Sequence, residues 1–93
     1  MIQINNKNFR IKRLVDETDS SIRHLTMVVI GDVRVFDNQV VDCCIVRDDD
    51  KEDNFRGTIL LPHYCESNRT TMFLISVEED WYETKKLPDG WNN

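Results

Sequence analysis

Three cysteines and a histidine have the clearest potential for chemistry in this chain: Cys43, Cys44, His63 and Cys65. Thiolates and imidazoles are common protein ligands of zinc. A cysteine beside a histidine can also act as a nucleophile in covalent catalysis. The spacing of these residues differs from that of zinc ribbons and zinc fingers, so their positions in the fold must decide what they do.

A hairpin between residues 39–47 and 57–65 would place three of the four on one face. Side chains alternate between the two faces of a strand, so Cys43, His63 and Cys65 would point the same way. The rest of that face is apolar, and three ligands fall short of a closed structural zinc site. Buried cysteines behave as small hydrophobic residues. We therefore predict reduced structural thiols, with no bound metal, no cofactor and no catalytic residue.

Two polar stretches contain the residue types of other sites without their patterns. Residues 48–53 (DDDKED) have the carboxylates of a calcium loop, but they lack the glycine and the glutamate that an EF-hand needs at its sixth and twelfth positions. Ser20, Ser21 and His24 lie near aspartates, but nothing resembles the nucleophile elbow of a hydrolase. A zinc-binding or hydrolytic small enzyme is a distant alternative, and we expect that the protein is not an enzyme.

Strands must position these residues, because β-type segments dominate the chain. The sequence contains no alanine, the strongest helix former, and it is rich in valine, isoleucine and threonine, which suit a pleated sheet. Alternating patterns and apolar runs predict strands over residues 9–15, 22–30, 33–36, 39–47, 57–64 and 70–77. Residues 22–30 also fit a helical spacing, so a helix there is the main structural alternative.

The predicted fold is mainly β, an antiparallel meander of five or six strands that forms a small barrel or a two-layer sandwich. Asp37 and Asn38 are expected to form a tight hairpin turn between two of the strands. One short helix is compatible with this fold, and an α+β fold is the alternative. A chain of 93 residues is expected to form a single domain over 1–93, in which residues 78–93 are an irregular tail that contains aromatic residues.

Acidic residues outnumber basic residues by 17 to 12, which gives a net charge of −5 at pH 7. This charge disfavours direct binding to nucleic acid or to an anionic membrane, and it favours a partner with a basic surface. In a simple meander, alternate loops share one end of the sheet. Ten carboxylates are then expected at one pole: Asp32, Asp48, Asp49, Asp50, Glu52, Asp53, Glu78, Glu79, Asp80 and Glu83. Such a pole is either a set of solvated loops or a surface that occupies a phosphate-binding groove of a partner.

Aromatic residues are concentrated in the tail, which contains Trp81, Tyr82 and Trp91. Tryptophan and tyrosine dominate binding hot spots, but they also anchor tails onto their own cores. The sequence leaves both alternatives open. The residues predicted to contact a partner come from the acidic loops and from this tail: Asp48, Asp49, Asp50, Glu52, Asp53, Glu78, Glu79, Asp80, Trp81, Tyr82 and Trp91.

The resulting hypothesis is a small, acidic, non-enzymatic binding protein of the cytoplasm, which for a viral protein is the host cytoplasm. No apolar run reaches the length of a membrane span and the first residues are polar, so neither a membrane segment nor a secretory signal is expected. We expect an inhibitor of phage or mobile-element type that mimics nucleic acid and blocks the basic nucleic-acid-binding surface of a host defence protein. The alternative is an accessory or structural subunit of a larger assembly, such as a phage particle. Homo-oligomer formation is compatible with either function.

Overall fold

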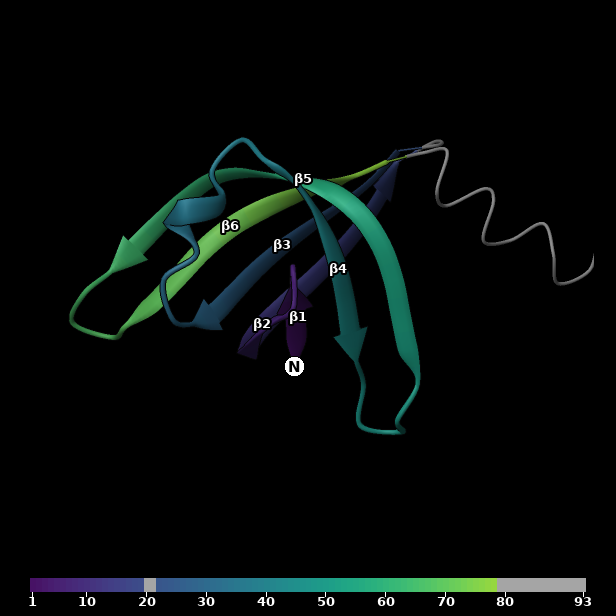
Figure 1. Cartoon of the computed structure of the whole chain (residues 1–93), viewed down its shortest axis with the longest axis horizontal. Coiled ribbons are helices and arrows are strands. Elements are labelled where there is room, and N and C mark those ends of the chain that lie inside the picture. The colour runs from purple at the N-terminus through teal and green to yellow at the C-terminus, as the bar shows by residue number, and fades with distance from the viewer. Residues whose placement is uncertain (20–21, 79–93) are drawn as a thin grey trace, which may run out of the picture.

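The computed structural model describes residues 1–19 and 22–78, which form a closed six-stranded antiparallel barrel (Figure 1). The elements are β1 (Ile2–Ile4), β2 (Lys7–Asp19), β3 (Ile22–Ile30), the 3-10 turn η1 (Arg34–Phe36), β4 (Val40–Val46), β5 (Glu52–Cys65) and β6 (Thr70–Val77). The predicted mainly β fold is confirmed, and residues 22–30 form a strand and not a helix. Within the described ranges, no helix has the length and apolar character needed to cross a membrane.

The barrel consists of two three-stranded meanders. β1, β2 and β3 form the first, and β4, β5 and β6 form the second. Antiparallel pairing of β1 with β4 and of β3 with β6 joins them into the closed order β1-β2-β3-β6-β5-β4. In each meander the central strand is the longest, and each central strand contains a register shift, between Ile11 and Arg13 in β2 and between Leu60 and His63 in β5. The topology therefore has an approximate twofold symmetry.

After β3 the chain departs from the simple meander expected from the sequence. Residues 33–36 contain a 3-10 turn and no strand, so the predicted hairpin through Asp37 and Asn38 is wrong. Val33 and Phe36 are both buried, and a spacing of three residues places side chains on one side of a 3-10 turn. Residues 31–39 instead form a crossover that carries the chain to β4, between β5 and β1.

Both long strands extend into segments that the sequence analysis predicts as polar loops. β2 continues to Asp19 and β5 begins at Glu52, since outward-facing positions near the ends of strands accept charged side chains. The early start of β5 shifts its pairing with β4, so that Cys43 lies opposite Phe55. The predicted pairing of residues 39–47 with residues 57–65 is therefore wrong in its register.

Inward-facing side chains fill the interior of the barrel. The largest fully buried ones are Phe73, Ile2, Ile4, Leu25, Met27, Ile59 and Ile75. A barrel of so few strands has an interior only wide enough for its own side chains. β2 differs from the other strands in how deeply it buries its apolar side chains. Its residues Phe9, Ile11 and Leu14 pack against the core but are only partly buried.

Candidate functional site

The residues of the predicted thiol–imidazole cluster do not meet. Cys43 points into the barrel and is only 4% exposed, whereas His63 is exposed on the outer surface, opposite Met72 of β6. Cys65 lies at the end of β5, where its Sγ is 3.3 Å from Ser67 Oγ. In the part of the chain that the structure describes, no group of three or more His, Cys, Asp or Glu side chains could hold a metal ion. The predicted convergence on one face is wrong, because the register shift between Leu60 and His63 in β5 turns His63 outward, and Cys43 pairs with Phe55, away from the end of β5 where Cys65 lies.

The chemical environments of the thiols differ accordingly. Burial raises the pKa of Cys43 to about 12, with smaller contributions from Asp42 and Cys44. The hydrogen bond with Ser67 lowers the pKa of Cys65 below the ordinary value of a thiol. Cys43 therefore behaves as a core residue and not as a nucleophile.

The loop between β4 and β5 exposes part of the predicted acidic pole. Four carboxylates are exposed on or directly after it, and we name them the acidic loop: Asp48, Asp49, Asp50 and Glu52. Lys51 Nζ lies 4.0 Å from Asp49 Oδ2, a loose contact between exposed side chains. The acidic loop is therefore accessible to a partner.

Asp53, by contrast, belongs to an ion-pair network. Arg23 Nη2 lies 2.7 Å from Asp53 Oδ2 and 2.9 Å from Asp16 Oδ2, so one guanidinium of β3 joins β2 to β5. Arg23 is 9% exposed, and its guanidinium carbon lies 5.6 Å from the centroid of the Phe55 ring. Burial alone would lower the pKa of Arg23, but the hydrogen bonds with Asp53 and Asp16 outweigh burial and raise the pKa. The network compensates the charge of Asp53 and ties three strands together.

Asp32 does not share a pole with the acidic loop, which corrects the expected arrangement of ten carboxylates. Asp32 lies near the C-terminal end of β5. It follows Ile30, the last residue of β3, which pairs with Thr70, and Thr70 in turn pairs with Cys65, the last residue of β5. The acidic loop precedes β5, so Asp32 and the acidic loop lie at opposite ends of that strand. Asp32 also forms an ion pair with Arg34, at 2.7 Å. The prediction fails because the chain crosses over after β3 and does not turn back as a meander.

The remaining residues predicted to contact a partner lie at or beyond the end of β6. Glu78 is half-buried, and its backbone N–H donates to the carbonyl oxygen of Arg56 at 2.9 Å. The other residues predicted to contact a partner lie outside the described residues: Glu79, Asp80, Trp81, Tyr82 and Trp91. Glu83 of the expected pole, and Ser20 and Ser21 of the serine–histidine pattern, also lie outside them.

An apolar surface that the sequence pattern did not predict lies on the outer face of β2, β3, β6 and β5. The register aligns two rows of outward-facing residues across these four strands. One row consists of Val15, Thr26, Leu74 and Leu60, and the next consists of Arg13, Val28, Met72 and His63. The signal for this surface is the run at residues 70–77 (TTMFLISV), which is apolar at positions of both parities. Such a run is typical of a strand that is covered on both faces.

Two adjoining hollows mark this face, with volumes of about 320 and 230 Å³. Glu17 and Thr26 line both hollows, which we therefore treat as one surface and name the outer groove. Its walls are mainly apolar, and Arg13, Glu17 and His24 supply charged or titratable groups. An exposed apolar surface with polar residues around it is typical of an interaction site.

Leu61 adds an exposed apolar side chain beside this face. It is 76% exposed, and it lies in the register shift of β5, directly before Pro62, with a φ of +52°. A leucine at positive φ is strained, and bulges often re-aim a side chain. Leu61 therefore contributes little to the packing of the barrel and is accessible to another molecule.

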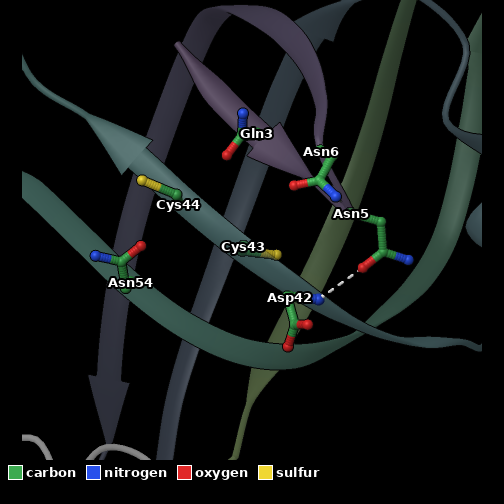
Figure 2. Close-up of a pocket in the computed structure, with 7 residues that line it drawn as sticks. All are labelled: Gln3, Asn5, Asn6, Asp42, Cys43, Cys44 and Asn54. Carbon is green, nitrogen blue, oxygen red and sulfur yellow. Dashed lines mark hydrogen bonds between the residues drawn. The ribbon is translucent and has the colours of Figure 1, made fainter.

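A third hollow, of about 240 Å³, is polar and lies over β1, β4 and β5 (Figure 2). Gln3, Cys44 and Asn54 share one register row across these strands. The turn after β1 is fixed to β4, because Asn5 N–H donates to the Asp42 carbonyl oxygen and Asp42 N–H donates to Asn5 Oδ1, both at 2.9 Å. The amides can bind a polar group by hydrogen bonds, but among the described residues that line this hollow only Asp42 carries a charge.

The chain is not recognisably similar to any protein family, characterised protein or solved structure. Its function has to follow from its surfaces. Within residues 1–19 and 22–78, the outer groove and the acidic loop combine exposure with a chemistry suited to a macromolecular partner.

Proposed function

We propose that this chain is a small non-enzymatic binding protein whose outer groove and acidic loop contact a partner protein. The observation that carries the proposal is the exposed apolar face of β3, β6 and β5, where Met72 is 51% exposed and Leu61 is 76% exposed. The barrel interior is occupied by core side chains, so binding falls to the outer surface. Burial of such side chains against a partner removes apolar area from water, a gain of about 25 cal/mol per Å² that the entropy cost of association partly offsets.

The acidic loop defines the chemistry of the partner. Exposed carboxylates gathered on one loop, in a chain with a net charge of −5, attract a basic surface. We infer an inhibitor of phage or mobile-element type, which mimics nucleic acid and occupies the basic nucleic-acid-binding surface of a host defence protein in the host cytoplasm. In this mechanism, long-range attraction by the acidic loop accelerates encounter, and the apolar contacts of the outer groove slow dissociation.

The test is the dependence of the association rate on ionic strength, with a partner captured from the host and identified by mass spectrometry. The test variant removes four charges and keeps the side-chain shapes: D48N/D49N/D50N/E52Q. The control variant removes exposed carboxylates elsewhere: D37N/E66Q. We expect the test variant to associate more slowly at low salt and to show a flatter salt dependence, while the control follows the wild type. Equal slopes for the test variant and the wild type would overturn the role of the acidic loop.

A second candidate function is that of an accessory or structural subunit of a larger assembly, such as a phage particle. Leu61 and Met72 favour it, because permanent interfaces are rich in apolar contacts. The same experiment separates the two functions. A subunit held by apolar burial should assemble with little dependence on salt and should tolerate the acidic-loop variant, but it should fail to assemble as L61D/M72K.

A further inference from the structure

One edge of β2 has no neighbouring strand over much of its length. Beyond Phe9, β2 continues beside β3 as far as Asp19, but on its other side β1 ends. No segment in the described ranges pairs with this second edge. Ile11 and Leu14 lie opposite buried residues of β3 and pack against the core, yet they are only half-buried. An uncovered edge of this kind presents backbone groups to which another strand can pair.

The middle of this edge carries exposed charges. Arg13 and Glu17 are both exposed, and Val15 between them is half-buried. All three face outward, because they lie opposite outward-facing residues of β3. Figure 1 shows the far end of β2 and the turn between β4 and β5 on different sides of the molecule. A strand can therefore approach β2 from the side that β1 leaves uncovered.

The charges of β2 change sign along the strand. Four exposed basic residues lie in its first part: Lys7, Arg10, Lys12 and Arg13. Two exposed acidic residues follow, Asp16 and Glu17. Within residues 1–19 and 22–78, neither Arg13 nor Glu17 forms an ion pair. An antiparallel copy of β2 presents the same charges in reverse order, so this edge is complementary to itself.

We propose that two copies of this chain pair through β2, antiparallel and about a twofold axis at Val15. In this register Val15 lies opposite the partner's Val15, and Arg13 lies opposite the partner's Glu17. The axis repeats the second contact, so the dimer contains two pairs of opposite charges on its outer face. Opposite charges directly across two strands stabilise their pairing, and like charges destabilise it.

The dimer extends the surface of the barrel. The two sheets become continuous, and the two outer grooves adjoin across the axis, because Arg13, Val15 and Glu17 line the groove. The partner's strand also covers Leu14. Because residues 13–17 form a smaller interface than a standard protein complex, we expect a dimer that dissociates on dilution. The inference does not depend on the proposed function, since dimer formation is measured on the chain alone.

Charge exchange on the full-length chain tests the proposal by analytical ultracentrifugation. We expect the wild type to show a monomer–dimer equilibrium. R13E and E17R should each weaken the dimer by about tenfold or more, because the axis repeats each like-charge contact. R13E/E17R should dimerise like the wild type, since opposite charges meet again. K7E is the matched control: it changes the net charge as R13E does, but it lies where β1 covers the edge, so it should leave the dimer unchanged.

A disulfide at the axis locates the contact independently of charge. Under mild oxidation V15C should form an intermolecular disulfide, identified by mass spectrometry of the linked peptides. T26C is the matched control, because Thr26 lies opposite Val15 on β3. Three strand spacings, about 14 Å, separate the two copies of Thr26 in the dimer, which is too far for a disulfide.

Far-UV circular dichroism verifies that each variant keeps the folded barrel. A wild-type chain that stays monomeric at millimolar concentration would overturn the proposal, as would a folded R13E variant that dimerises like the wild type. A folded R13E/E17R variant that fails to dimerise, or equal cross-linking of T26C and V15C, would overturn the register at Val15 and with it the proposal.

Discussion

At the scale of single residues, position in the barrel separates side chains that look equivalent in the sequence. Cys43 and Cys44 are neighbours, but alternation directs Cys43 into the core, whereas Cys44 lies half-buried on the other face of β4. Asp53 follows the acidic loop directly, yet it is one-fifth exposed and bound to Arg23. Residue type therefore does not define the role of a thiol or a carboxylate here; burial and partners do.

The thiols should differ in reactivity near neutral pH. We predict that Cys65 is alkylated by iodoacetamide faster than Cys43, because the thiolate is the reactive form and burial raises the pKa of Cys43 to about 12. The hydrogen bond with Ser67 lowers the pKa of Cys65. Time-resolved labelling read by mass spectrometry measures both rates, and C65S should abolish the fast modification at that position while leaving Cys43 protected. Alkylation of Cys43 in the folded protein at its denatured rate would contradict the prediction.

The Asp32 carboxyl should have a pKa below the ordinary value of an aspartate. Its side-chain hydrogen bond with Arg34, assisted by the Arg34 backbone N–H, lowers its pKa from 3.8 to about 2. A carboxyl whose pKa is lower in the folded state stabilises the fold above the unfolded value and loses this effect as the pH falls. The contribution should therefore disappear between about pH 4 and pH 2. An NMR titration of the Asp32 carboxyl measures the pKa, which R34Q should return toward 3.8. A titration unchanged in R34Q would assign the shift to another cause.

At the scale of elements, local backbone geometry determines where strands turn and how closely they pass. Asn5 and Asn6 both have positive φ, as a tight turn between twisted strands requires, and they join β1 to β2. In β5, the shift at Leu61 and Pro62 bends the long strand and moves its pairing with β6 by one residue. The bend of this strand exposes Leu61 beside the outer groove.

Close approach of β5 and β6 makes Gly57 sensitive to substitution. A Cβ at this position would lie 2.7 Å from Ile75 Cγ2 and 2.8 Å from the carbonyl oxygen of Ser76. We predict that Gly57→Ala lowers the free energy of unfolding by about 1–3 kcal/mol, the usual cost of overpacking. Urea denaturation measures the change, with Glu52→Ala at the exposed start of the same strand as a control that should stay within about 0.5 kcal/mol. Wild-type stability of Gly57→Ala would show that the two strands separate easily there.

At the scale of the whole molecule, closure of the barrel depends on contacts between residues far apart in the chain. Ile2 pairs with Ile45, and Ile30 pairs with Thr70, so both junctions between the meanders join distant segments. The entropy of closing these loops has to be overcome before the contacts stabilise the fold. The junctions also create the outer groove, since they bring β2 and β3 beside β6 and β5.

This topology predicts slow folding. Proteins dominated by non-local strand pairing refold in about milliseconds to seconds, whereas helical proteins refold in microseconds to milliseconds. We expect the wild-type chain to refold in the slower range after dilution from urea. Stopped-flow circular dichroism in the far ultraviolet measures the rate. Refolding within microseconds would mean that the junctions form from residual structure in the unfolded chain.

The sequence by itself determines the class of the fold and most of the core. Alternating apolar positions and the absence of alanine predict a mainly β chain, and the apolar run at residues 22–30 is a strand in the barrel, as its β-branched residues indicate. The acidic loop is also evident from the sequence, because charged residues in a run between two apolar segments must face water.

Only the tertiary structure decides which strands are neighbours and in which register they pair. Alternation assigns a side chain to a face but says nothing of the partner strand, which long-range packing selects. For this reason Cys43 lies apart from His63, and Asp32 lies away from the acidic loop. The outer groove has the same origin: its residues come from strands whose proximity arises from pairing β3 with β6, and no local pattern encodes that pairing.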